Sequence, residues 1–254
     1  WRQFSDYHCL GETFAERSCL FENVCFSPSN RSWLFYQAKG RTSLPLSTFV
    51  AQNNQVLWNE DNLFDKSWRV ALECSYNHKR SKYEGEPGFF TFKPPTVING
   101  PIYRHRSRSP QFVESPHVLF SRSHHDDNAG HLLFDTYHPL LTAINSHIGM
   151  DFARNVTTVD LVWNNQIFSR YTQVFDKKWK IFIGNNLFKN QIHFREFLAE
   201  NRAKVANSSY GLKVVCYRKL LVGCGQLAGL DGQAMHRQQS FHHIRKVLWE
   251  KYAP

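Results

Sequence analysis

The residues of this chain whose types and spacing could do chemistry gather in one short segment, His124–Asp135, which reads HHDDNAGHLLFD. Imidazole and carboxylate groups held close together can act as general acid and base. An apolar run that predicts a short buried strand over Val118–Ser121 precedes the segment, and a helical pattern follows it. We therefore expect a strand end to deliver histidines and aspartates to the beginning of a helix.

That helix is predicted from about Gly130 to His147, with Asp127 or Asn128 as its N-cap. At about 100° per residue, one face carries the apolar side chains Leu133, Tyr137, Leu140, Leu141, Ile144 and Ile148. The opposite face carries His131, Asp135, His138 and Thr142. Pro139 should bend the helix, because it lacks an N–H and its ring crowds the preceding turn.

The beginning of this helix is a candidate site for an anion as well as for proton transfer. Free N–H groups and the dipole at a helix N-terminus attract phosphate, and ligands of open α/β sheets gather at the carboxyl ends of strands. The alternative is a well-capped amphipathic helix whose histidine and aspartate face is solvated. A metal site is disfavoured, because His124, His125, Asp126 and His131 follow no zinc-motif spacing.

Two other motifs favour ordinary loops. The GCGQLA run at 223–228 fits the glycine pattern of dinucleotide sites, but the nearest acidic residue at the required distance, Glu250, is in a helical pattern. Cys216 and Cys224 instead favour a turn tied by a disulfide. The basic run Arg104–Arg108 lacks interleaved aromatic residues, which favours a solvated loop over a nucleic-acid-binding tract.

The remaining patterns predict an α/β fold. We expect strands at Cys19–Phe26, Ser32–Gln37, Val159–Trp163, Lys180–Ile183, Leu212–Tyr217 and Leu220–Gly223, and helices at His193–Val205 and His236–Tyr252. The alternation after His117 predicts a parallel, Rossmann-like layer. We expect residues 1–110 to form a cysteine-containing β or irregular region with a long loop over 75–117, and residues 111–254 to form the Rossmann-like domain.

The composition narrows the class of protein. The chain has 254 residues, of which 42% are hydrophobic, so it can bury a core and is not disordered as a whole. Its net charge of +10 favours anionic partners. No apolar run approaches the roughly 18–20 residues that a membrane helix needs. Because the sequence begins with Trp1, we expect a processed form or a fragment.

The cysteines and glycosylation sequons favour the secretory pathway. The cluster Cys9, Cys19 and Cys25 and the pair Cys216 and Cys224 are spaced for short-loop disulfides, although the even set of six cysteines leaves the connectivity open. Asn-x-Ser/Thr sequons occur at Asn30, Asn155 and Asn207. We expect an ER or Golgi lumenal protein, or a secreted one.

Two stretches resemble glycosyltransferase family 61. Cys19–Cys25 (CLFENVC) resembles the Cys-x-Phe-Glu-Asn-x-Cys signature near the start of many catalytic regions. The run Asn128-x-x-His131-x-x-x-Asp135-x-x-x-Pro139-Leu140 resembles a stretch of the protein O-linked mannose N-acetylglucosaminyltransferases. The resemblance covers about residues 15–250, the first half of a family catalytic region, so we expect the donor domain to be missing from this chain.

The resemblance implies the acceptor-side half of a GT-B enzyme that transfers a sugar, with inversion and without a metal, from a UDP-linked donor to a glycoprotein or polysaccharide. Inversion needs a base for the acceptor hydroxyl and positive groups for the departing diphosphate. The base candidates are His131 and Asp127, then Asp126 and His125; Asn128, Gly130 and Asp135 are candidates for acceptor or phosphate contacts. The alternative is a secreted, non-catalytic module that binds glycan or protein. A nucleic-acid-binding protein is a third, disfavoured reading.

Overall fold

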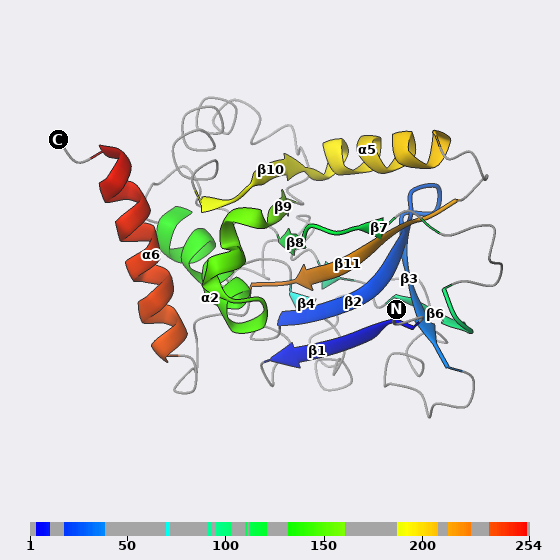
Figure 1. The fold of residues 1–254 in the computed structure, drawn as a ribbon, viewed down its shortest axis with the longest axis horizontal. Helices are drawn as coiled ribbons and strands as arrows, with labels where there is room; N and C mark the ends of the chain where they lie inside the picture. Colours follow the sequence, from blue (N-terminus) through cyan, green and yellow to red (C-terminus); the bar gives the residue numbers. More distant parts are fainter. Residues whose placement is uncertain are drawn as a thin grey trace, which may run out of the picture.

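The computed structural model describes residues 4–10, 18–38, 70–71, 91–92, 95–102, 110, 112–120, 132–160, 187–207, 213–224 and 234–252. In this part of the chain the fold is mixed α/β, with one large mixed sheet and helices on both of its faces (Figure 1).

The large sheet has the strand order β10-β9-β8-β11-β2-β3-β6, with β1 beside β2 and β7 beside β11. Its strands are β1 (Asp6–Leu10), β2 (Ser18–Ser27), β3 (Ser32–Gln37), β6 (Thr96–Asn99), β7 (Phe112–Val113), β8 (His117–Phe120), β9 (Thr157–Asp160), β10 (Asn190–His193) and β11 (Val215–Val222). The neighbours β10, β9, β8 and β11 are all parallel, whereas β2 is antiparallel to β11, β3 and β1. The short strands β4 (Val70–Ala71) and β5 (Thr91–Phe92) pair separately.

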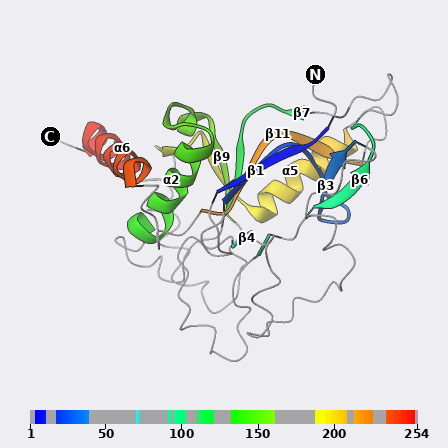
Figure 2. The same cartoon turned by 90° about the horizontal axis from the view of Figure 1, so that it is seen from below.

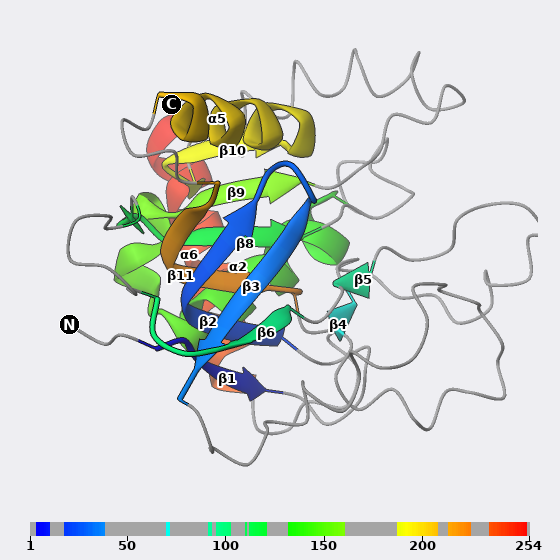
Figure 3. The ribbon, with the colours of Figure 1, turned by 90° about the vertical axis from the view of Figure 1, so that its right-hand side faces the viewer.

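Helices cover the two faces of the sheet. Along β8, Val118 and Phe120 belong to one buried cluster and Leu119 belongs to the other, as the alternation of side chains in a strand requires. Helix α5 (Phe194–Ala206) packs on the Leu119 side through Phe197 and Leu198. On the other side lie η4 (Leu132–Tyr137), α2 (His138–His147) and α6 (Ala234–Tyr252). Figure 3 shows α5 beside β10 at one end of the sheet.

The local sequence explains these elements. All of β8 and β9 is buried, which is typical of parallel strands with helices on both faces. A capping box begins α5: the His193 side chain accepts from the N3 backbone N–H, and Glu196 Oε2 accepts from the His193 N–H at 3.0 Å. Pro139 lies in the first turn of α2, where its missing N–H costs little, and the preceding turn is the π-helical η4.

Most predicted elements are confirmed with shifted ends. The predicted strands at 19–26, 32–37 and 118–121 correspond to β2, β3 and β8, and the predicted helices at 193–205 and 236–252 correspond to α5 and α6. The strand expected at 159–163 is described over Thr157–Asp160, and the one expected at 180–183 lies outside the described residues. The predicted helix at 130–147 is η4 followed by α2, so Pro139 marks a change of helical type.

Two predictions about the C-terminal half are wrong. The strands expected at 212–217 and 220–223 are one continuous strand, β11, because β2 pairs with it on both sides of Arg218, through Tyr217 and through Lys219. Thr142, expected on the face of α2 away from the core, is 2% exposed, because α6 packs against α2. Figures 1 and 2 both show these two helices side by side.

The described disulfides join directly opposed residues of neighbouring strands. Cys9 of β1 is bonded to Cys19 of β2, a short-loop pair within the predicted cluster. Cys25 of β2 is bonded to Cys216 of β11, so the predicted pairing of Cys216 with Cys224 is wrong. The reason is the register of β2 and β11, which places Cys25 opposite Cys216 although 191 positions separate them. Cys224 is disulfide-bonded as well.

Strands from both sides of the predicted boundary at residue 110 therefore share one sheet, and the β2–β11 pair with its disulfide joins them. The division into two domains stays a prediction. None of the described helices is long and apolar enough to cross a membrane.

Candidate active site at the carboxyl edge of the sheet

The carboxyl ends of the parallel strands meet at one edge of the sheet. In the register of β8, β9 and β10, Phe120 lies opposite Asp160, and Asp160 lies opposite His193. The fourth parallel strand, β11, ends at the same edge, where the Gly223 N–H donates to the Leu119 carbonyl at 3.0 Å. In a sheet of this kind the edge at the strand ends is the usual place for a ligand.

Asp160 and His193 are site residues that sequence reasoning missed. Asp160 is 1% exposed and ends β9, and His193 is half-buried and caps α5. The two residues are opposed in the register of β9 and β10, so a carboxyl group and an imidazole come to the same edge of the sheet. The sequence did signal Asp160, as a charged residue inside an apolar run. The strand predicted over 159–163, however, placed Asp160 in the interior of the strand and not at its end.

Most of the predicted site residues lie outside the described residues. These are His124, His125, Asp126, Asp127, Asn128, Gly130 and His131. In the sequence they connect Phe120, at the carboxyl end of β8, to Leu132, at the beginning of η4. Asp135 belongs to η4. Their roles remain predictions.

The helical segment after the candidate residues has an unusual form. Six residues, Leu132–Tyr137, are π-helical, a geometry that is rare and is frequent at functional sites. Its last residue, Tyr137, is buried and joins η4 to β10: Gln191 Nε2 donates to the Tyr137 hydroxyl at 3.2 Å. This buried polar contact fixes η4 against the sheet close to the edge that carries Asp160 and His193.

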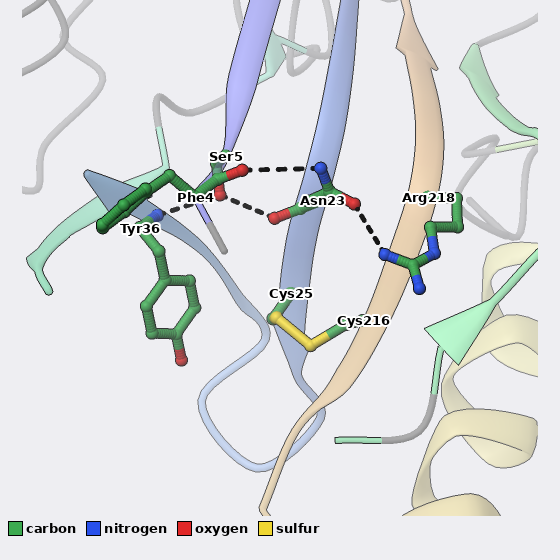
Figure 4. The surroundings of a disulfide bond; sticks show 7 residues. All are labelled: Phe4, Ser5, Asn23, Cys25, Tyr36, Cys216 and Arg218. Atoms are coloured by element: carbon green, nitrogen blue, oxygen red, sulfur yellow. Dashed lines mark hydrogen bonds between the residues drawn. A yellow bond between two sulfur atoms is a disulfide. The ribbon is translucent and has the colours of Figure 1, made fainter. Parts of the chain in front are cut away.

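The FENVC part of the first family-like stretch has a structural explanation. Asn23 lies in β2 between the residues that pair with β1 and those that pair with β3, and its φ of 53° is one that asparagine tolerates. The Ser5 hydroxyl donates to the Asn23 carbonyl at 2.6 Å, and the Asn23 amide donates to the Phe4 carbonyl at 3.4 Å. Arg218 Nη1 donates to Asn23 Oδ1 at 3.0 Å (Figure 4).

Asn23 therefore marks the point along β2 at which its pairing with β1 ends and its pairing with β3 begins. The Ser5 hydroxyl also accepts from the Tyr36 N–H at 2.9 Å, which completes the connection between β2 and β3. Arg218 lies over the Phe112 ring at 3.7 Å and pairs with Glu114 at 3.2 Å. Cys25 is bonded to Cys216 beside it, so the stretch holds neighbouring strands of the sheet together (Figure 4).

An imidazole–hydroxyl contact lies near the amino end of β2. His147 Nε2 and the Ser18 hydroxyl are 3.0 Å apart, and the His8 ring meets the His147 ring edge-on with centroids 5.8 Å apart. Burial, and then the nearby His8, lower the pKa of His147 to about 4, so its ring is neutral at pH 7. Because Ser18 is buried, this pair is better suited to joining α2 to the sheet than to attacking a substrate.

Buried polar groups at the other end of the sheet are structural. Burial lowers the pKa of His117 to about 4, and its Nδ1 donates to the Ser115 carbonyl at 3.0 Å. Burial also raises the pKa of Tyr217, whose hydroxyl donates to Asn201 Oδ1 at 2.7 Å beneath α5. These groups are satisfied within the core and lie at the amino ends of β8 and β11, away from the candidate site.

The three sequon asparagines are exposed. Asn30 lies in the turn between β2 and β3, Asn155 ends η5 (Met150–Asn155), and Asn207 is the C-cap of α5. Within the described ranges, no group of three or more histidine, cysteine, aspartate or glutamate residues could hold a metal ion. The basic run 104–108 and the glycine-rich residues 225–228 lie outside those ranges.

No protein-family model and no curated protein matched the chain.

Proposed function

We propose that the chain is the acceptor-side part of an inverting glycosyltransferase similar to family 61, built on a Rossmann-like layer. The observation that carries the proposal is the edge at which β8, β9, β10 and β11 end together. The second family-like stretch, Asn128 to Leu140, occupies the connection between this edge and α2 in the sequence. In α/β enzymes, the loops that connect the carboxyl end of a parallel strand to the following helix commonly carry the residues of the active site.

In this proposal the acceptor hydroxyl loses its proton to His131 or Asp127, and its oxygen attacks the anomeric carbon of the donor sugar. The bond between that carbon and the diphosphate oxygen breaks, and the diphosphate leaves with the electron pair. Asp126, His125, Asn128, Gly130 and Asp135 supply acceptor or phosphate contacts. Asp160 and His193, opposed at the end of the strands, orient the base.

Both described disulfides join strands of the sheet, which supports a lumenal or secreted protein that forms them in an oxidising compartment. The ER or Golgi lumen is the compartment we propose. The alternative function is a non-catalytic module of the same fold that binds glycan or protein. An exposed groove between α2 and α6 favours this alternative and is described below.

The test uses the native polypeptide that contains this chain, purified from the secretory pathway and supplied with UDP-N-acetylglucosamine or UDP-xylose and a glycoprotein acceptor. Transfer of labelled sugar is measured for the wild type, His131→Ala, Asp127→Asn and the control Asp151→Asn, an exposed carboxylate in η5. We expect at least one candidate variant to lose about 100-fold or more in rate, since general-base catalysis contributes roughly 10²–10⁴-fold. The control should keep its rate, and all variants should keep the wild-type melting temperature.

Full activity in both candidate variants would overturn the site assignment. Absence of transfer and of UDP-sugar hydrolysis by the folded wild type would overturn the enzymatic proposal and leave the binding module.

A further inference from the structure

An open groove of about 400 Å³ lies between α2 and α6. His138 lines it from the first turn of α2, and Gln238, Phe241, His242 and Arg245 line it from α6. The Phe241 ring meets the His138 ring edge-on with centroids 6.0 Å apart and is still 47% exposed. This volume is within the range of small-ligand sites.

The described residues that line the groove offer a cation and no anion. They include the Arg245 guanidinium and two imidazoles and no carboxylate. The nearest acidic residue on the described part of α6, Glu250, already pairs with Lys246 at 3.7 Å and with Arg154 at 3.9 Å. Among the described residues, Arg245 has no acidic partner. A planar guanidinium of this kind binds carboxylate or sulfate oxygens through two parallel hydrogen bonds.

The uncharged part of the lining favours a sugar over a peptide carboxylate. The Gln238 amide can both donate and accept hydrogen bonds, which suits hydroxyl groups, whereas a carboxylate only accepts. The exposed face of Phe241 carries negative potential and attracts the C–H groups of a sugar ring. Trp249, 70% exposed and one helical turn beyond Arg245, adds a second aromatic ring on the same side of α6.

We propose that this groove binds an acidic sugar unit of a glycan, with Arg245 pairing with its carboxylate or sulfate and Phe241 packing against its ring. The binding does not depend on sugar transfer at the carboxyl edge, so it holds for an enzyme and for a binding module alike. Trp249 extends the contact to a neighbouring sugar unit.

The experiment measures binding of the folded chain by calorimetry at about 0.15 M salt, where exposed charges are largely screened beyond about 8 Å. The probes are hexasaccharides of hyaluronan and of chondroitin sulfate, neutral chitohexaose, and a hexaglutamate peptide. Arg245→Gln and Phe241→Ala alter the groove. Lys246→Gln is the matched control, because it removes the same charge from the next residue of α6 without changing the lining.

We expect at least one acidic hexasaccharide to bind and the chitohexaose and the peptide to bind at least tenfold more weakly. Arg245→Gln should weaken binding about tenfold, which corresponds to about 1.4 kcal/mol. Phe241→Ala should weaken it severalfold, and Lys246→Gln should change it less than twofold.

Three results would overturn the proposal. Equal losses in Arg245→Gln and Lys246→Gln would mean non-specific attraction by a basic helix. Equal binding of the peptide would mean an acidic protein segment as the partner. No binding of either acidic hexasaccharide by a chain with an unchanged melting temperature would mean that the groove takes no acidic sugar.

Discussion

Replacing the disulfide between Cys25 and Cys216 should destabilise the protein more than replacing the one between Cys9 and Cys19. Both bonds join opposed residues of antiparallel strands, Cys25 and Cys216 being fully buried and Cys9 partly buried. They differ in the chain that they close, 191 positions for the first and 10 for the second. A cross-link restricts the unfolded chain more when it closes a longer loop.

The magnitude follows from loop-closure entropy. For a loop of 191 positions the expected stabilisation is about 5 kcal/mol, and for one of 10 positions it is about 2.7 kcal/mol. The double variants Cys25→Ala/Cys216→Ala and Cys9→Ala/Cys19→Ala remove each bond without leaving a single thiol. The first should therefore lose roughly 2–3 kcal/mol more free energy of unfolding than the second.

The assay is urea unfolding followed by tryptophan fluorescence. The slope of the unfolding free energy against urea should also rise more for the Cys25/Cys216 variant, because its unfolded chain becomes more expanded. Equal losses of stability in the two variants, with equal slopes, would refute the loop-length argument and place the stabilisation in local strand contacts.

Two further predictions concern Asn23 and His147. Asn23→Ala should lower the free energy of unfolding by about 2–3 kcal/mol, since it loses two side-chain hydrogen bonds and places alanine at a φ of 53°. Asn23→Gly should recover about 1 kcal/mol of this loss, because glycine adopts that φ without strain. If urea unfolding shows the glycine variant to be no more stable than the alanine variant, the backbone contribution is excluded. The pKa of His147 falls from 6.5 to about 4 on folding, so the unfolded chain binds more protons between these values and stability is lost as the pH falls. Lowering the pH from 7.5 to 5 should reduce the free energy of unfolding of the wild type by about 2 kcal/mol more than that of His147→Gln. If the melting temperatures of the two proteins fall equally with pH, His147 is not responsible.

The sequence predicted the elements whose patterns are local. The apolar runs at β2, β3 and β8 and the helical periodicities of α2, α5 and α6 depend on residues a few positions apart, so they could be read without the fold. The buried stripe that runs from Tyr137 of η4 to Ile144 of α2 followed from the same periodicity. Pro139 was expected to bend the helix; the structure has the π-helical η4 end at Tyr137 and α2 begin at His138, with Pro139 in its first turn.

The candidate site was only partly predictable. The histidine and aspartate residues of the segment 124–135 pointed to a site there. Asp160 and His193 were missed, because their proximity depends on the register of β9 and β10. The groove between α2 and α6 could not be foreseen either, since it joins residues about 100 positions apart in the chain.

The sequence by itself determined an α/β chain with a buried core, a basic surface and a disulfide-forming set of cysteines. Only the tertiary structure decided that Cys216 bonds to Cys25, that Arg218 supports Asn23, and that one sheet contains strands from both halves of the chain. The physical reason is that strand pairing is set by contacts between residues far apart in sequence, and one shift of register changes every opposed pair.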